Sequence, residues 1–149
     1  MKNRIIYFIA ICVVLFLLGC NSSNSPPKDT SGKTPDQFLL ETYQLIVNGQ
    51  FDEAEKRFSP AFLEKFVYKN YDSFSQYFLD RKTGLRSSDW KSEWLKAKLI
   101  GNDYNDDLWR AKIIVDAGKG AENPPGVVND LYLIDGVWKI VFWGDYPES

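Results

Sequence analysis

Leu131-Tyr132-Leu133-Ile134-Asp135-Gly136-Val137-Trp138-Lys139-Ile140 decides the fold of this 149-residue chain, because it contains a complete β-hairpin signal. Asp135-Gly136 is typical of a two-residue type I′ turn between antiparallel strands. That turn sets Leu133 opposite Trp138 and so fixes which side chains share a face. One face of the hairpin is predicted to be apolar, and it carries Leu131, Leu133, Trp138, Ile140 and Phe142.

Alternation of apolar and polar residues extends upstream of the hairpin. It predicts four strands, over 94–100, 107–117, 126–134 and 137–143. The apolar residues of the first two strands are predicted to continue the apolar face of the hairpin: Leu95, Ala97, Leu99, Trp109, Ala111, Ile113 and Val115.

Helical spacing precedes the strands. Thr34-Pro35-Asp36-Gln37 predicts a helix start, with a hydroxyl cap, a proline at the first position and a glutamine that can close a capping box. Asn48-Gly49 predicts its end. Shorter helical patterns begin at Phe51, Ser59 and Tyr71. This order predicts a single α+β domain over 34–149, with N-terminal helices packed on a curved antiparallel sheet of four or more strands.

An apolar run over residues 5–18 lies near the N-terminus. Lys2 and Arg4 lie around its start, and it leads into the stretch Leu17-Leu18-Gly19-Cys20. This pattern resembles the signal of bacterial lipoproteins, although a residue smaller than Leu18 is more usual at that position. The resemblance implies cleavage after Gly19 and a lipid anchor on Cys20.

These features divide the chain into a signal peptide, residues 1–19, a tether over 20–33 and the folded domain. The tether is rich in Ser, Pro and Asn and is predicted to be disordered. An uncleaved membrane anchor is the alternative, but a bilayer span needs about 20 apolar residues and this run is shorter. The domain is therefore expected at the extracytoplasmic face of the cell membrane, held there by the lipid on Cys20.

Composition excludes several function classes. Without residues 1–19 the chain has 16 cationic and 20 acidic residues, so nucleic acid is not expected as a partner. The chain has no histidine, which removes His-based nucleophile systems and His-ligated metals, and no cofactor or metal is expected. Asp103, Asn105 and Asp107 have calcium-loop spacing, but Leu108 and Ile114 stand where the loop needs glycine and glutamate. We interpret this polar cluster as a turn between two strands.

Two motifs support a resemblance over residues 34–144. Asn48-Gly49-Gln50-Phe51-Asp52-Glu53-Ala54 and Asp135-Gly136-Val137-Trp138-Lys139 resemble the helix turn and closing hairpin of small envelope lipoproteins of the nuclear-transport-factor-2-like, cystatin-like superfamily. The resemblance implies a roll with a cone-shaped cavity between helices and sheet. Its expected lining, for which ordinary core packing is the alternative, is Tyr43, Tyr77, Trp109, Trp138 and Phe142.

The other sheet face is predicted to be basic and aromatic. An anionic envelope polymer, phospholipid headgroups or a partner protein could bind there. The alternatives are a solvated face or a homodimer face. Its predicted members are Trp94, Lys96, Lys98, Arg110, Lys112, Tyr132, Lys139 and Trp143.

The sequence therefore predicts a non-enzymatic ligand-binding or partner-binding accessory module. The alternative is a small-molecule isomerase or dehydratase that uses the cavity. Asp80, with Tyr77 one turn earlier, is its nearest catalytic candidate, although Asp80 beside Arg81 and Lys82 equally suits a solvated helix end.

Overall fold

A computed structural model describes residues 25–80, 90–105, 108–116 and 127–141 of the chain. Helices and an antiparallel sheet make up an α+β fold, as predicted. Within the described ranges, no helix has both the length and the apolar character that crossing a membrane requires.

The sheet has four antiparallel strands in the order β1-β2-β3-β4. They are β1 (Lys96–Asn105), β2 (Leu108–Asp116), β3 (Val127–Ile134) and β4 (Val137–Val141). The β3–β4 hairpin has the predicted register, with Leu133 opposite Trp138. Asp135 and Gly136 have φ values of 50° and 75°, as a type I′ turn requires. The sheet is not strongly curled, so the curvature expected of it is not observed.

The prediction for the first strand is wrong at both ends. Trp94 belongs to a short 3₁₀ helix, η4 (Ser92–Trp94), in which its amide donates to the carbonyl of Lys91 at 2.9 Å. At the other end β1 continues through Asn105, because pairing with β2 satisfies the backbone of polar residues as well as apolar ones. Most of the polar cluster interpreted as a turn is therefore strand, and residues 106–107 lie outside the described residues.

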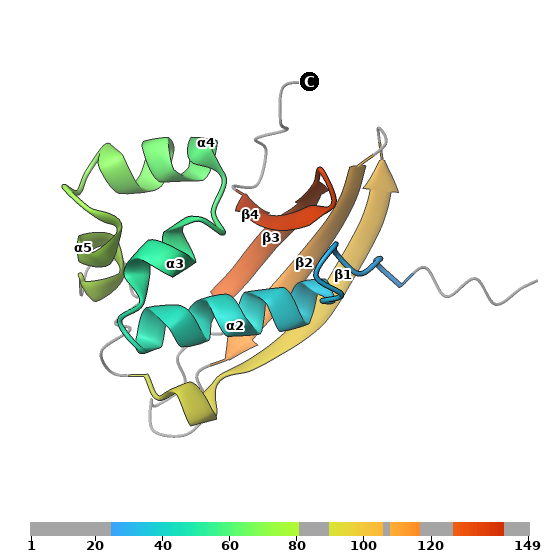
Figure 1. Ribbon diagram of the computed structural model, residues 1–149, viewed down its shortest axis with the longest axis horizontal. Coiled ribbons are helices and arrows are strands. Elements are labelled where there is room, and N and C mark those ends of the chain that lie inside the picture. Colours follow the sequence, from blue (N-terminus) through green and yellow to red (C-terminus); the bar gives the residue numbers. More distant parts are fainter. Residues whose placement is uncertain (1–24, 81–89, 106–107, 117–126, 142–149) are drawn as a thin grey trace, which may run out of the picture.

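Besides η4, four helical segments precede the sheet within the described residues. They are α2 (Pro35–Val47), α3 (Phe51–Glu55), α4 (Pro60–Phe62) followed directly by the π-helical η1 (Leu63–Tyr68), and α5 (Phe74–Leu79). The predicted caps are present: the Thr34 amide donates to Gln37 Oε1 at 3.1 Å, and the Phe62 amide donates to Ser59 Oγ at 3.1 Å. Helix α2 lies along one face of the sheet, whereas α3, α4 and α5 lie beyond β4 (Figure 1).

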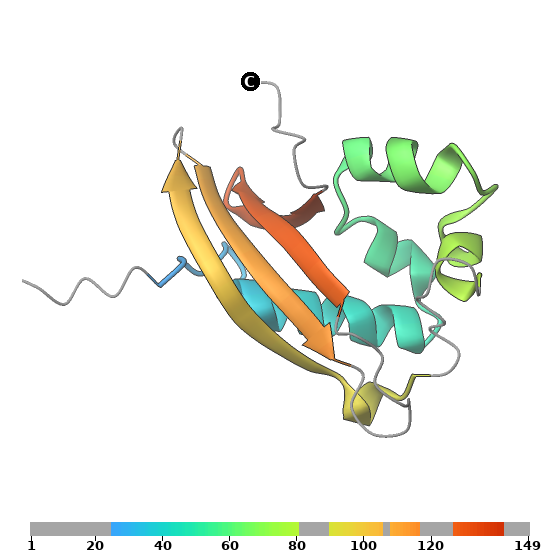
Figure 2. The ribbon, with the colours of Figure 1, turned by 180° about the vertical axis from the view of Figure 1, so that it is seen from behind.

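The core lies between these helices and the face of the sheet that the sequence predicted to be apolar. Both α2 and the loop before α4 contribute large buried side chains to it. No described helix covers the opposite face, which Figure 2 shows from the front. The largest fully buried members are Trp138, Tyr43, Phe74, Phe78, Leu39, Ile46, Ile113, Leu131 and Ile140.

The outer edge of β4 is closed by the segment before α4. The Ser59 amide donates to the Ile140 carbonyl at 2.8 Å, and the Ile140 amide donates to the Arg57 carbonyl at 3.0 Å. Phe58 thereby forms a parallel bridge with Ile140. These bonds join the helical part of the chain to the last strand.

The expectation of a disordered tether over 20–33 is wrong for its last part. Residues 29–33 form a compact loop, in which the Asp29 amide donates to the Lys33 carbonyl at 2.9 Å. The Asp29 side chain is buried. This stretch has too few apolar residues to be ordered by burial of apolar surface. Local hydrogen bonds of its aspartate and serine side chains order it instead. Cys20 lies outside the described residues.

Candidate functional site

The candidate site is the sheet face turned away from α2, here called the open face. Strand register places the predicted cations on it: Lys98 lies opposite Ile114, and Lys112 lies opposite Gly101. Arg110 follows on the same face, opposite Asp103 on one side and Tyr132 on the other.

A hollow of about 300 Å³ lies on the open face at the β1–β2 pair. Register shifts between Leu99 and Gly101, so an extra residue bulges there and Gly101 comes opposite Lys112. Gly101 leaves space beside Lys112, because a Cβ added to it would stand 4.0 Å from the Lys112 Cβ. The lining residues are Gly101, Asn102, Asp103, Arg110 and Lys112.

The charge of Arg110 is partly neutralised within the sheet. Its Nη2 donates to Asp130 Oδ1 at 3.2 Å, and the Asp130 side chain is buried. Partial burial acts to lower the pKa of Arg110, but the hydrogen bond and charge of Asp130, with smaller effects of Tyr132 and Asp103, raise it overall. Arg110 is therefore a fixed, permanently charged donor.

The lysines on this face differ from Arg110 in forming no ion pair. Within the described ranges neither Lys98 nor Lys112 pairs with a carboxylate, although Asp130 lies opposite Lys112 in the sheet. Lys98 and Lys96 are exposed on β1, and Lys112 is half-buried on β2. Their ammonium groups are the remaining cationic donors of the open face.

Three of the predicted members that the structure describes do not contribute to this basic surface. Trp94 lies in η4, with Lys91 Nζ 4.7 Å from its ring centroid. Tyr132 is buried, and Lys139 Nζ donates to the Lys56 carbonyl at 2.6 Å. Trp143 lies outside the described residues.

The predicted cavity lining lies mainly in or against the core. Trp138 is fully buried, and its Nε1 has no hydrogen-bond acceptor among the described residues. Trp109 is half-buried against Tyr104, with ring centroids 5.2 Å apart, and Tyr77 packs edge-on against Phe78 at 5.0 Å. Phe142 lies outside the described residues. The hollow at the β1–β2 pair and the two grooves beside the helices that are described below are lined by other side chains.

Tyr43, another predicted lining residue, takes part in a buried polar contact. Its hydroxyl donates to Asn129 Oδ1 at 3.1 Å, and its ring stacks on Trp90 with centroids 5.8 Å apart. Burial raises the pKa of Tyr43 strongly, and the hydrogen bond to Asn129 offsets only part of this effect. The phenol therefore stays neutral and joins α2 to β3.

The catalytic candidate Asp80 accepts a hydrogen bond from the Tyr71 hydroxyl at 3.0 Å. Partial burial and, to a smaller extent, the Asp80 carboxylate raise the pKa of Tyr71. The sequence did not reveal this pair, because Tyr71 lies in the turn before α5 and not on the helix itself.

Two grooves beside the helices were also missed. One, of about 500 Å³, lies between α3, α4 and β4, and the other, of about 600 Å³, follows the outer side of η1. Their charges are mixed, and Tyr68 donates to Glu55 where η1 meets α3. No group of three or more metal-ligating side chains occurs among the described residues. The first groove is lined by Asp52, Glu55, Lys56, Phe58, Pro60, Leu63 and Lys139, and the second by Ala61, Glu64, Lys65, Tyr68 and Lys69.

Comparisons with family models, curated proteins and solved structures found no match to this chain.

Proposed function

We propose that this chain is an extracytoplasmic lipoprotein, anchored to the cell membrane through Cys20, whose domain is a non-enzymatic binding module. The signal-like stretch Leu17-Leu18-Gly19-Cys20 supports the anchor. The order of helices before a terminal hairpin supports a cystatin-like, nuclear-transport-factor-2-like domain. Metabolic labelling of the chain with a radioactive fatty acid tests the anchor, because labelling has to disappear in Cys20→Ala.

The binding surface in this proposal is the open face, and its ligand is an anionic polymer of the envelope. The observation that carries it is the position of Lys98 and Lys112, diagonal neighbours on one face that form no ion pair with a described carboxylate, although Asp130 lies opposite Lys112 and pairs with Arg110. A polymer with repeated anionic groups suits this surface, because single exposed charges bind weakly and several must act together. Arg110, held by Asp130, would give such a ligand a fixed position.

Titration with a glycerol phosphate polymer tests this role, with the full chain kept in detergent. Lys98→Glu with Lys112→Glu is expected to lower the affinity at least tenfold and to flatten its dependence on salt. Lys65→Glu in η1 with Lys69→Glu directly after it is the matched control, since this pair makes the same change of charge at another exposed site. Unchanged binding by the Lys98 and Lys112 variant, or an equal loss in both, would contradict the proposal.

An isomerase-like or dehydratase-like activity has less support. The Tyr43 hydroxyl is bonded to Asn129 inside the core, and Trp138 is fully buried. Neither side chain is placed to act on a bound molecule.

A further inference from the structure

The loop over 29–33 is closed by one buried carboxylate. Asp29 is 8% exposed, and its Oδ1 accepts from the Ser31 amide at 2.9 Å, the Ser31 hydroxyl at 2.7 Å and the Lys33 amide at 2.9 Å. The Gly32 amide donates to the Asp29 carbonyl at 2.9 Å, and Gly32 has a φ of 82°. The loop is therefore a built structure and not an extended strand of tether.

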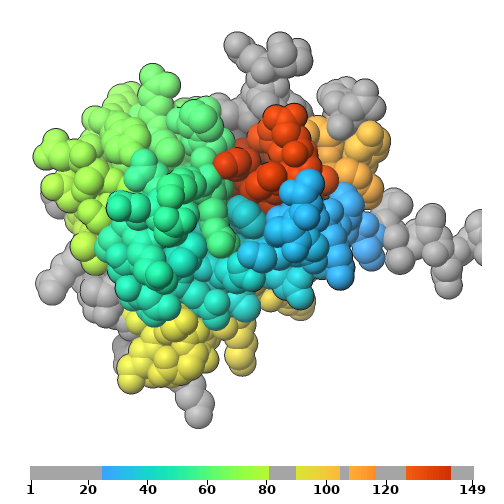
Figure 3. Space-filling view, viewed as in Figure 1, coloured from blue at the N-terminus to red at the C-terminus, as the bar shows by residue number. Residues whose placement is uncertain are grey.

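This loop is also docked on the domain. The Thr30 amide donates to the Gly136 carbonyl at 2.8 Å, in the turn between β3 and β4. Lys33 pairs with Glu41 of α2, whose carboxylate also lies 3.5 Å from Arg57 Nη1. The space-filling view shows the blue segment packed against the red hairpin (Figure 3). The chain is thus fixed to the domain at Thr30 and Lys33, before α2 begins.

Docking shortens the link between the domain and the membrane. Cys20 and Asp29 are nine residue steps apart, and this stretch fully extended reaches about 30 Å. Without the loop, the 15 steps from Cys20 to Pro35 would reach about 50 Å. The β3–β4 turn is consequently the part of the domain held nearest the anchor.

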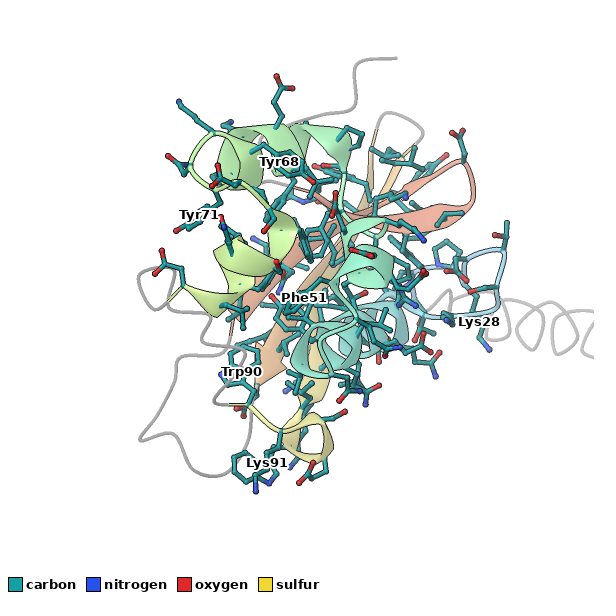
Figure 4. All side chains as sticks on the ribbon, turned by 60° about the vertical axis from the view of Figure 1, so that its left-hand side comes forward. Lys28, Phe51, Tyr68, Tyr71, Trp90 and Lys91 are labelled. Carbon is teal, nitrogen blue, oxygen red and sulfur yellow. The ribbon has the colours of Figure 1, made fainter. Side chains whose placement is uncertain are left out.

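Both ends of the sheet carry charges of both signs. The hairpin end, where Asn105 pairs with Leu108, carries Asp103 and Asp135 together with Lys28 and Lys33 of the docked segment. The far end carries Lys91 and Lys96 together with Glu93 and Asp116, and η4 lies there, away from the blue N-terminal segment (Figures 1 and 2). Figure 4 shows Lys28 and Lys91 on well-separated sides of the molecule. The orientation therefore follows from where the chain is docked and not from a difference in charge.

We propose that residues 29–33 form a clamp that orients the domain on the membrane, with the β3–β4 turn toward the lipid and the end bearing Lys91 and Lys96 outward. The surface that the β3–β4 turn faces in this arrangement is the membrane that holds the anchor. This inference rests on the proposed function in requiring an anchor near residue 20. An uncleaved apolar segment over 5–18 would place the membrane exit at the same point of the chain.

Limited trypsin digestion of the full chain in detergent tests the clamp without a membrane. Cleavage is expected after Lys28, whereas the docked Lys33 is expected to resist. Asp29→Ala should speed cleavage after Lys33 at least tenfold, and Asp36→Ala, in the first turn of α2, is the matched control. A melting temperature measured by circular dichroism shows whether each variant is folded. Equal cleavage at Lys28 and Lys33 in the unchanged chain would overturn the clamp.

Energy transfer on vesicles tests the orientation. Single donors are placed at Val137→Cys, beside the turn, and at Glu93→Cys, in η4, in a chain with Cys12→Ser. The vesicles contain phosphatidylcholine and phosphatidylglycerol with an acceptor on the headgroup. Transfer is expected to be at least twofold stronger from position 137, and Asp29→Ala should remove most of this difference.

Equal transfer from the two positions in the clamped chain would overturn the orientation. The absence of a lipid anchor gives a different result. The protein would then not float with vesicles, or the unmodified thiol of Cys20 would react with the dye. In that case the trypsin pattern still decides whether the clamp exists.

Discussion

The amide of Thr30 donates to the carbonyl of Gly136, and the Thr30 methyl carbon lies 2.8 Å from where a Cβ on Gly136 would stand. Two segments more than 100 residues apart in the sequence therefore meet at a position that accepts only glycine. The positive φ of 75° at Gly136 adds a second reason for glycine.

Gly136→Ala is expected to lower the free energy of unfolding by about 2–3 kcal/mol, from backbone strain together with the clash. Gly32→Ala is the matched control, because Gly32 also has a positive φ but no atom within 4 Å of an added Cβ, and it should lose only about 1 kcal/mol. Urea unfolding followed by tryptophan fluorescence measures both. Thr30→Ser removes the methyl group, so adding it to Gly136→Ala should recover part of the lost free energy of unfolding. If the effects of Thr30→Ser and Gly136→Ala on stability were strictly additive, the contact between the two positions would be contradicted.

Tyr43→Phe is expected to destabilise the domain by about 1–2 kcal/mol, since it leaves the buried Asn129 Oδ1 without the phenol donor. Tyr68→Phe removes a hydroxyl that is exposed and should change stability by less than about 0.5 kcal/mol. Thermal unfolding of the two variants in parallel makes the comparison. A similar loss of stability in both variants would show that the buried hydrogen bond from Tyr43 to Asn129 contributes no more than the exposed one from Tyr68.

The clamp is expected to weaken in acid. Burial acts to raise the pKa of Asp29, but hydrogen bonds from Lys33 and Ser31 outweigh it and lower the pKa below the ordinary value of 3.8. A carboxylate whose pKa is lower in the folded state stabilises the fold above its unfolded pKa, and this contribution is lost as the pH falls through the folded pKa. The free energy of unfolding of the unchanged chain should therefore exceed that of Asp29→Asn by its full amount at pH 6, and this difference should shrink below about pH 4. An advantage independent of pH from 2 to 6 would contradict the role of this carboxylate.

Asp130→Asn is expected to strengthen binding of the glycerol phosphate polymer about threefold, because it releases the charge of Arg110 on the open face. The same change should cost roughly 1.5–3 kcal/mol of stability, since it removes the charged acceptor of a hydrogen bond in a partly buried pair. Binding titrations at two salt concentrations would show a steeper salt dependence in the variant. Weaker binding with the fold intact would mean that Arg110 does not face the ligand.

Gly101→Val tests the hollow itself. A valine at this strand position has no neighbour closer than the Lys112 Cβ at 4.0 Å from its own Cβ, so the fold should be kept. Its branched side chain would fill the space beside Lys112 and is expected to weaken polymer binding at least threefold. Undiminished affinity would place the binding surface elsewhere on the domain.

Much of the fold follows from short-range signals in the sequence. Asp135-Gly136 was sufficient to predict the β3–β4 register, and the hydroxyl before each proline at 35 and 60 was sufficient to predict two helix starts. These features depend on neighbouring residues, whose local chemistry is visible without the rest of the chain.

The rest depended on contacts between distant residues. The bulge at Ile100 inserts one residue into β1 and reverses the alternation after it, which a strict period of two cannot anticipate. Asp29 is a charged residue in a polar stretch, so the sequence does not predict that its side chain is buried. It is buried in the loop whose Thr30 amide donates to the Gly136 carbonyl. The groove between α3, α4 and β4 is assembled from three elements and has no sequence pattern of its own.

On the outer edge of β4 the Ile140 amide donates to the Arg57 carbonyl and the Ile140 carbonyl accepts from the Ser59 amide, and in the turn before β4 the Gly136 carbonyl accepts from the Thr30 amide. Among the described strands, β1 is then the one whose outer edge is not paired to another described segment. A sheet with one available edge can add a single copy of itself, after which no edge is left. Strand pairing between two copies of the chain would therefore use the outer edge of β1 and give a two-fold dimer.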